Sequence, residues 1–174
     1  MIAVSDTGPL LYLSLIDCAE LLPRIFEKVL VPRAVADELS DAATPSQASS
    51  LIAHKPSWLD IRTTSRTDPS LQRLGPGERE AITLAVSVPA DVLLTDDAAA
   101  RRIATQVCNI AASGTIGMLY EAAIDDLIPF TAADFDKSVE RLLATNFRRT
   151  PTLLKAIQEL SRKLHERRIG PASP

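Results

Sequence analysis

The chain has 174 residues, which is enough for one domain with a sizeable core and a small helical addition. It is 46% hydrophobic and 24% charged, with a formal net charge of −3, a composition typical of globular proteins. The absence of a signal-like N-terminus and of an apolar run near the roughly 20 residues of a spanning helix predicts a cytoplasmic protein without membrane association.

The first half of the chain alternates short apolar runs with helical patterns. Residues 1–5 predict a buried strand that ends in turn-forming residues. A short helix is expected over 10–16, and Asp17 with Glu20 resembles a capping box for a second helix, which Pro23 interrupts. The next expected elements are a buried strand at 29–31, a helix opened by Pro32, a loop or helix entry at 40–50, a helix at about 45–54 and an edge strand at 58–61.

The second half continues the alternation and ends in helices. Residues 62–76, rich in Thr, Ser, Pro and Arg, predict an exposed connection. Thr131 with Asp134 is expected to cap one late helix, and Thr150 with Pro151 to open the last. The other expected elements are a helix at 77–88, a buried strand at 92–95, a helix to about 107, a weaker strand at 109–112 and a helix from 115 to 127.

Strands that alternate with helices predict an α/β fold with a mostly parallel central sheet and right-handed crossovers. We expect residues 1–130 to form the main domain and residues 131–174 to form a helical extension packed on it.

Charge is unevenly distributed between these two parts. Residues 1–135 contain 10 basic and 18 acidic side chains, whereas residues 136–174 contain 9 basic and 4 acidic ones. The basic tail has two interpretations: it helps to hold a polyanion, or it is a solvated amphipathic helix.

Acidic residues recur where the expected strands end. Asp6 directly follows the first strand, and the alternative is that it forms a turn or caps the next helix. Asp96 and Asp97 follow the strand at 92–95, where one is expected to cap the next helix and the other to reach a pocket. Thr7 and Thr95 place hydroxyl groups nearby that can bind the carboxylates or a phosphate.

Three glutamates on expected helices complete the acidic set. Glu38 lies beside apolar residues of its helix, so it either lines a pocket or lies at the solvent boundary. Glu78 and Glu80 lie in the first turn of another helix, where acids are also favoured by the helix dipole. Because residues two apart do not share a helix face, one of them is expected to bind the metal directly and the other to support the ligands from behind. Glu78 is slightly favoured as the ligand, because it shares a helix face with Ile82 and Ala85.

The carboxyl ends of parallel strands meet at one edge of a sheet, so these acids should converge there. Clustered like charges are costly unless a cation lies among them, and Mg²⁺ or Mn²⁺ prefers oxygen ligands. One or two such ions would lower the pKa of a bound water and neutralise an attacked phosphate. The sequence therefore predicts metal-dependent phosphodiester chemistry.

The motifs SDTGPL, VPRAVADEL, GPGEREAITLA, LLTDDAAAR and GTIGML, in this order, resemble the PIN-domain nucleases. They are most similar to the toxin-like prokaryotic subgroup related to the VapC ribonucleases. The resemblance covers about residues 2–128, and NFRRTPTLLKAI also resembles the C-terminal helix of that subgroup.

The resemblance implies a three-layer α/β/α fold and an Mg²⁺- or Mn²⁺-dependent endoribonuclease that cleaves RNA. It also implies a homodimer and a small antitoxin that covers the acidic pocket, which would make the chain the toxin of a toxin–antitoxin pair. The catalytic and metal-binding residues that it implies are Asp6, Glu38, Glu78 or Glu80, and Asp97, and it places Thr7 and Thr115 close to the site. Thr95 and Asp96 are expected there from their position at the end of a strand.

Other classes of protein share parts of this acidic pattern. The triplet Asp6-Thr7-Gly8 is also found in aspartic proteases, but these need a β-rich fold and two such triplets. Phosphatases of the haloacid-dehalogenase type need a second Asp two residues after the first, where this chain has Gly8. A receiver-type module needs a suitably placed Lys, and Lys28 and Lys55 are poorly placed for it. A non-catalytic PIN-like protein that acts as an interaction or regulatory scaffold remains the alternative.

Overall fold

The computed structural model describes residues 1–64 and 71–167, and the chain divides into two compact units. The first unit spans Met1–Thr115 and the second Ile116–Pro174. This grouping places the helix that begins at residue 115 almost wholly in the second unit, whereas the sequence analysis placed it in the main domain. In the described part of the chain, no helix has both the length and the apolar character needed to cross a membrane.

The first unit is built around a parallel sheet with five strands among the described residues. The expectation of a mostly parallel sheet is therefore confirmed, as is the edge position of the strand near residue 60. The last strand begins two residues later than expected, after the left-handed backbone of Asn109 (φ 53°). In the spatial order β3-β2-β1-β4-β5, the strands are β1 (Ile2–Ser5), β2 (Lys28–Pro32), β3 (Leu59–Arg62), β4 (Val92–Leu94) and β5 (Ala111–Ser113).

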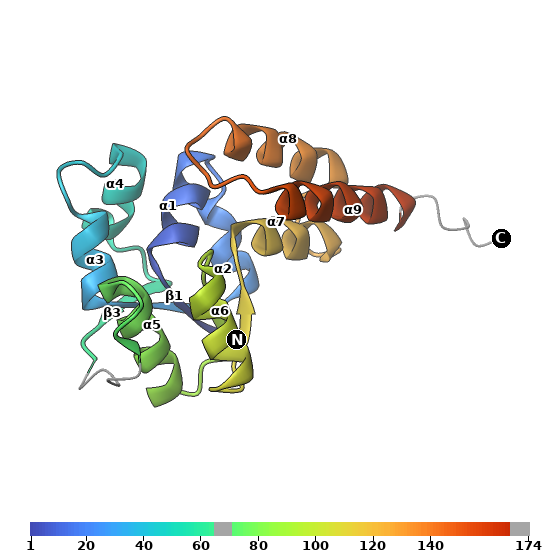
Figure 1. Ribbon diagram of the computed structural model, residues 1–174. Helices are drawn as coiled ribbons and strands as arrows, with labels where there is room; N and C mark the ends of the chain where they lie inside the picture. The colour runs from blue at the N-terminus through green and yellow to red at the C-terminus, as the bar shows by residue number, and fades with distance from the viewer. Residues whose placement is uncertain (65–70, 168–174) are drawn as a thin grey trace. The chain divides into compact units, whose positions relative to one another are not determined.

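Helices cover both faces of this sheet, so the unit is a three-layer α/β/α sandwich. Right-handed crossovers place the connections that run from β1 toward β3 on one face and those that run toward β5 on the other. Figure 1 shows α1 and α4 on one side of the strands and α5 and α6 on the other. The helices are α1 (Thr7–Leu15), η1 (Ala19–Leu21), α2 (Leu22–Ile25), α3 (Arg33–Leu39), α4 (Ser46–His54), α5 (Pro76–Ser87) and α6 (Ala98–Gln106).

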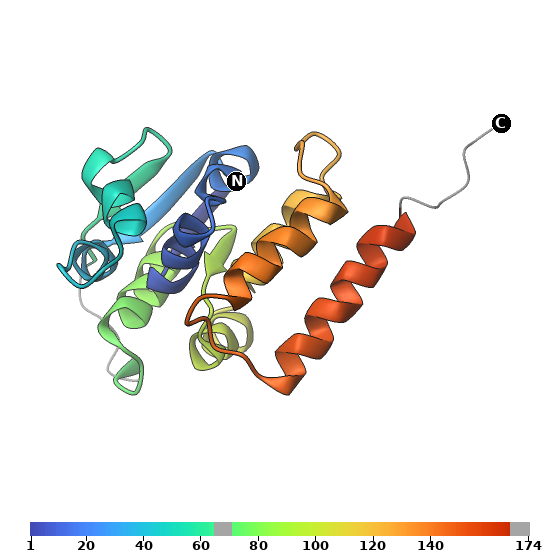
Figure 2. The ribbon, with the colours of Figure 1, turned by 90° about the horizontal axis from the view of Figure 1, so that it is seen from above.

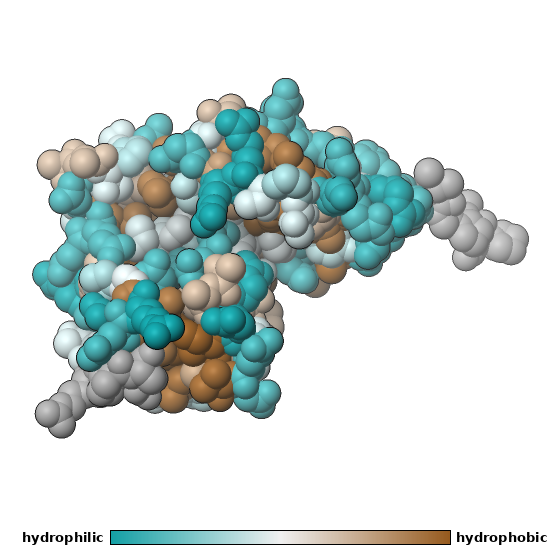
Figure 3. Space-filling view, viewed as in Figure 1, coloured by the Kyte–Doolittle hydropathy of each residue, from teal (hydrophilic) through white to brown (hydrophobic). Residues whose placement is uncertain are grey.

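One core layer lies between the sheet and the two helices α5 and α6. Side chains that alternate along the strands, among them Val4, Leu30 and Leu93, pack there against small residues such as Ala81 and Ala104. Small helix residues let helix and sheet approach closely. Over the same two helices, Figure 3 shows apolar surface, and Val86 and Val107 are 60% and 77% exposed.

Two expectations near the N-terminus are wrong. The first helix begins at Thr7 instead of Leu10, because Asp6 caps it and Pro9 needs no hydrogen-bond donor in the first turn. Asp17 and Glu20 do not form a capping box. Asp17 has a left-handed backbone (φ 58°), and a 3₁₀ turn without a side-chain cap follows it.

Several boundaries agree with the sequence. Pro23 lies in the first turn of α2, where a proline restarts a helix. The connection expected at 62–76 falls partly on residues 65–70, which lie outside the described residues. Within its described part, Leu71 is buried in the core, so this connection is not exposed throughout.

The second unit is helical. Its helices in the described residues are α7 (Thr115–Ile124), α8 (Ala132–Leu143) and α9 (Pro151–Arg167), and Figures 1 and 2 show α8 and α9 side by side. The capping box of Thr131 with Asp134 is confirmed. Tyr120 packs edge-to-face on the fully buried ring of Phe135, with 6.4 Å between the ring centroids.

Candidate active site at the carboxyl edge of the sheet

The strand order brings the ends of β1 and β4 together. Just beyond the last paired residues of these neighbouring strands, the Asp6 amide donates a hydrogen bond of 3.0 Å to the Leu94 carbonyl oxygen. Connections leave them toward opposite edges of the sheet, and such a switch point is where open α/β sheets bind ligands. The acids after β1 and β4 are therefore neighbours, as the sequence predicted.

Asp6 is the most deeply buried of these acids, with 5% of its surface exposed. Its Oδ1 accepts from the Gly8 amide at 3.1 Å, which caps α1, and the Thr95 hydroxyl also donates to this carboxylate. The pKa of Asp6 is raised to about 7, mainly by burial; the negative charges of Asp96 and Glu78 contribute to the rise, and the two hydrogen bonds oppose it. Asp6, Asp96 and Glu78 thus lie within electrostatic reach of one another.

The two aspartates after β4 have different partners. Asp97 caps α6 through Oδ1, which accepts from the Ala100 amide at 2.7 Å. Asp96 uses both oxygens on Thr115, accepting from its amide at 2.8 Å and from its hydroxyl at 2.6 Å. Burial raises the pKa of Asp96 while these bonds lower it. The expectation that one aspartate caps the helix is therefore confirmed for Asp97, and Asp96 binds Thr115.

Glu38 lies across from the first turn of α1. The Thr7 hydroxyl donates a short hydrogen bond to Glu38 Oε2, which joins α1 to α3. A Cβ at Gly77 would lie 3.0 Å from the same oxygen and 3.2 Å from Thr7 Oγ1, so the start of α5 is also adjacent. Glu38 is exposed, so it lies at the rim of the acidic cluster.

The two glutamates of α5 point to different neighbours. Glu78 contributes to the raised pKa of Asp6. Glu80 instead accepts from the Ala34 amide at 3.0 Å and satisfies a free donor in the first turn of α3. The structure therefore brings Glu78 together with Asp6 and engages Glu80 in a cap.

Three threonine hydroxyls each hold one carboxylate of the cluster. Thr95 binds Asp6, while Thr7 and Thr115 hold Glu38 and Asp96 as described above. Thr95 and Thr115 are fully buried, so their hydroxyl groups are held in place. All three were expected near the site from the sequence.

Glycines make room for Asp96. A Cβ on Gly114 would lie 2.5 Å from Asp96 Oδ1 and 3.0 Å from the Thr95 carbonyl oxygen, and one on Gly8 would lie 3.1 Å from Asp96 Oδ2. Neither glycine has a positive φ, so the need is for space and not for backbone freedom.

Arg101 is a site neighbour that the sequence analysis missed. Its Nη2 donates to the Thr95 carbonyl oxygen at 2.8 Å, and its charge lowers the pKa of Asp96. The sequence feature that could have indicated Arg101 is its position four residues after Asp97, which places it one turn further along the same helix.

The cluster fits a hard divalent cation in its chemistry. Its donors are carboxylate and hydroxyl oxygens, and the glycines leave the carboxylates room. Across residues 1–64 and 71–167, however, no three or more His, Cys, Asp or Glu side chains are arranged as they would be to hold a metal ion. The carboxylates point instead to threonine hydroxyls and helix N-termini.

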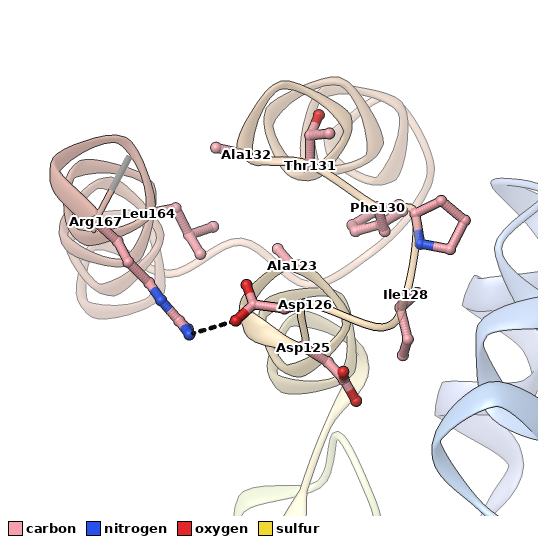
Figure 4. A pocket seen from close by; sticks show the side chains of 10 residues that line it. Ala123, Asp125, Asp126, Ile128, Phe130, Thr131, Ala132, Leu164 and Arg167 are labelled. Carbon is pink, nitrogen blue, oxygen red and sulfur yellow. Dashed lines mark ion pairs between the residues drawn. The ribbon is translucent and has the colours of Figure 1, made fainter. Parts of the chain in front are cut away.

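A pocket in the second unit contains none of these residues (Figure 4). The connection between α7 and α8 lines it together with Leu164 and Arg167 of α9. Arg167 closes one side, where Nη2 lies 3.6 Å from Asp126 Oδ2 and Nη1 donates to the Ile124 carbonyl oxygen at 2.8 Å.

Comparisons with known proteins bear on the family. The family described as PIN domain matches residues 2–163. Among solved structures, the chain is similar to a PilT N-terminus domain protein from the hyperthermophilic archaeon Sulfolobus solfataricus P2. The identity is 15% and the TM-score 0.48, over 86% of this chain and 100% of that one. No curated protein matches the sequence significantly.

Replacing Asp6 by Asn should stabilise the metal-free protein more at pH 8 than at pH 4. The folded pKa of about 7 exceeds the ordinary value of 3.8, so wild-type stability falls as pH rises between these values. Asn keeps the cap and removes the charge. The gain above pH 7 should approach an upper limit on the order of 4 kcal/mol, measured by urea unfolding in EDTA. A difference between variant and wild type that does not change with pH would contradict this.

Replacing Gly114 by Ala should destabilise the fold by about 1–3 kcal/mol, because the new Cβ would displace Asp96 from Thr115. Gly8→Ala is the matched control and should cost less, since its Cβ meets Asp96 at a longer distance. Denaturant unfolding of both variants measures the difference. Equal free energies of unfolding for the two variants would contradict this, because they would show that Asp96 can leave Thr115 without loss of stability.

Proposed function

The chain belongs to the PIN-domain family, and from that premise we propose that it is an Mg²⁺- or Mn²⁺-dependent endoribonuclease. PIN domains are generally nucleases. RNA as the substrate and the identity of the metal are parts of the proposal. The observation that supports it best is the buried Asp6, whose pKa is raised to about 7 beside Asp96 and Glu78.

The proposed ligands are Asp6, Glu38, Glu78 and Asp97. Asp97 caps α6 through one oxygen, and a carboxylate can use its second oxygen for a cation. Glu38 would reach the cation by leaving the Thr7 hydroxyl, since its side chain is exposed and lies at the rim. Asp96 has both oxygens on Thr115, so we assign it the role of holding the end of β4 in place.

When bound, the divalent ion supplies a water of lowered pKa and offsets the charge of the attacked phosphate. The protein's own contribution is to orient the carboxylates. The Thr95 hydroxyl donates a hydrogen bond that orients Asp6, and the Thr95 carbonyl oxygen accepts one from Arg101. A substrate phosphate at the rim would meet the Thr7 hydroxyl at the start of α1, where helix N–H groups favour anions.

We further propose that the chain is the cytoplasmic toxin of a toxin–antitoxin pair, acts as a homodimer and is inhibited by a small antitoxin. The support is the motif resemblance to the VapC-related subgroup. The second candidate is a non-catalytic PIN-like scaffold. It is favoured by the absence, within the described residues, of three side chains already arranged around a metal position.

Asp6→Asn and Asp97→Asn should each reduce Mn²⁺-dependent RNA cleavage by at least roughly a hundredfold, because each removes a proposed ligand charge. Both substitutions keep a good helix cap, so circular dichroism should show an intact fold. The measurement is a gel assay on a panel of RNAs, with EDTA as the control. Calorimetric titration with Mn²⁺ tests the scaffold: wild-type protein that binds no Mn²⁺ and cleaves no RNA would support it over the nuclease.

The substitutions Glu78→Gln and Glu80→Gln should have different effects on metal-dependent cleavage. The first should lose most metal-dependent cleavage, because Glu78 is the one whose charge acts on Asp6. The second should keep it, because the side-chain amide oxygen that replaces the carboxylate can still accept from the Ala34 amide. Mn²⁺ affinity of both variants gives a second readout. The reverse order of losses would assign the ligand role to Glu80.

A further inference from the structure

The segment of the second unit around the start of α9 has basic residues and no acidic ones. Residues 141–158 contain Arg141, Arg148, Arg149 and Lys155 and no Asp or Glu. The first turn of α9 also contains no acid, so the positive end of its dipole is not offset there.

The far half of α9 is different, because its cations are paired with acids of the same unit. Arg162 lies 2.6 Å from Glu159 and also binds Glu166, and Lys163 lies 3.7 Å from Glu159. Arg167 is engaged with Asp126 and a backbone carbonyl, as described above. These cations are largely neutralised within the protein.

Arg148, Arg149 and Lys155 are exposed, and no carboxylate pairs with them in the part of the chain that the structure describes. Three unpaired cations within eight residues of chain, two in the connection before α9 and one on α9, favour a partner with closely spaced negative charges, which is a nucleic-acid backbone. Phe147, the aromatic residue beside them, is 7% exposed and so does not offer a ring for stacking bases. The contact should therefore involve phosphates and tolerate any base sequence.

We propose that Arg148, Arg149 and Lys155 form a phosphate-binding surface that holds single-stranded RNA. This inference rests on the proposed function, because it assigns the RNA a second contact outside the acidic cluster. It also separates the two interpretations of the basic tail: the start of α9 and the preceding connection bind RNA, whereas the far half of α9 is a solvated, internally paired helix.

The test is the double variant Arg148→Gln/Arg149→Gln, with affinity for a fluorescein-labelled oligouridylate measured by anisotropy in EDTA, where no cleavage occurs. Each lost contact to single-stranded RNA removes about 0.7 from the slope of log affinity against log salt. The slope should therefore fall by about 1.4, and affinity near 0.15 M salt should fall roughly tenfold. The matched control, Arg162→Gln/Lys163→Gln, removes the same charge from ion pairs and should change affinity less than about twofold.

Equal losses in both double variants, or no loss in the first, would overturn the proposal. Retained RNA binding with lost binding to phosphatidylserine vesicles or to polyglutamate would assign the surface to a membrane or an acidic protein instead. Mn²⁺-dependent hydrolysis of bis(p-nitrophenyl) phosphate distinguishes the two levels of inference. The Arg148→Gln/Arg149→Gln variant should keep this hydrolysis. If the wild-type protein shows no such hydrolysis, the proposed nuclease function is wrong, while the RNA-binding result stays valid.

Discussion

Mutual repulsion among carboxylates at one edge of a parallel sheet is the constraint around which the first unit is organised. Asp6, Asp96 and Glu78 are close enough for their charges to act on one another, and Asp6 is almost fully buried. Such a cluster persists only if fixed donors offset its charge. Threonine hydroxyls and helix N–H groups supply that offset here, and Arg101 adds one nearby positive charge.

The sheet and its helices place these donors before any ligand is considered. Strand order sets β1 beside β4, so the capped starts of α1 and α6 lie next to each other. The Thr95 hydroxyl connects these helix starts, because it donates a hydrogen bond to Asp6 and accepts one from the Asp97 amide at 3.2 Å. Gly8 and Gly114 leave space between them. The same features that stabilise the edge therefore also orient the carboxylates proposed above as metal ligands.

The two units differ in charge in a way that suits a polyanionic substrate. The acidic cluster lies in the first unit and needs a cation before it can approach a phosphate. The second unit presents unpaired Arg148, Arg149 and Lys155, which attract phosphates directly. Under the two proposals made above, the second unit would bind the substrate backbone and the first would cleave it. The acidic body by itself would repel RNA.

The sequence by itself determined the alternation of strands and helices, the parallel sheet and the placement of Asp6 and Asp96–Asp97 at strand ends, because these follow from local periodicity and turn chemistry. It also predicted the box formed by Thr131 and Asp134, whose partners are three residues apart. Only the tertiary structure placed Glu78 near Asp6 and Glu80 against the Ala34 amide, since these neighbours come from distant segments. It likewise decided which cations of the tail are paired, because side-chain direction and contacts across helices leave no local pattern in the chain.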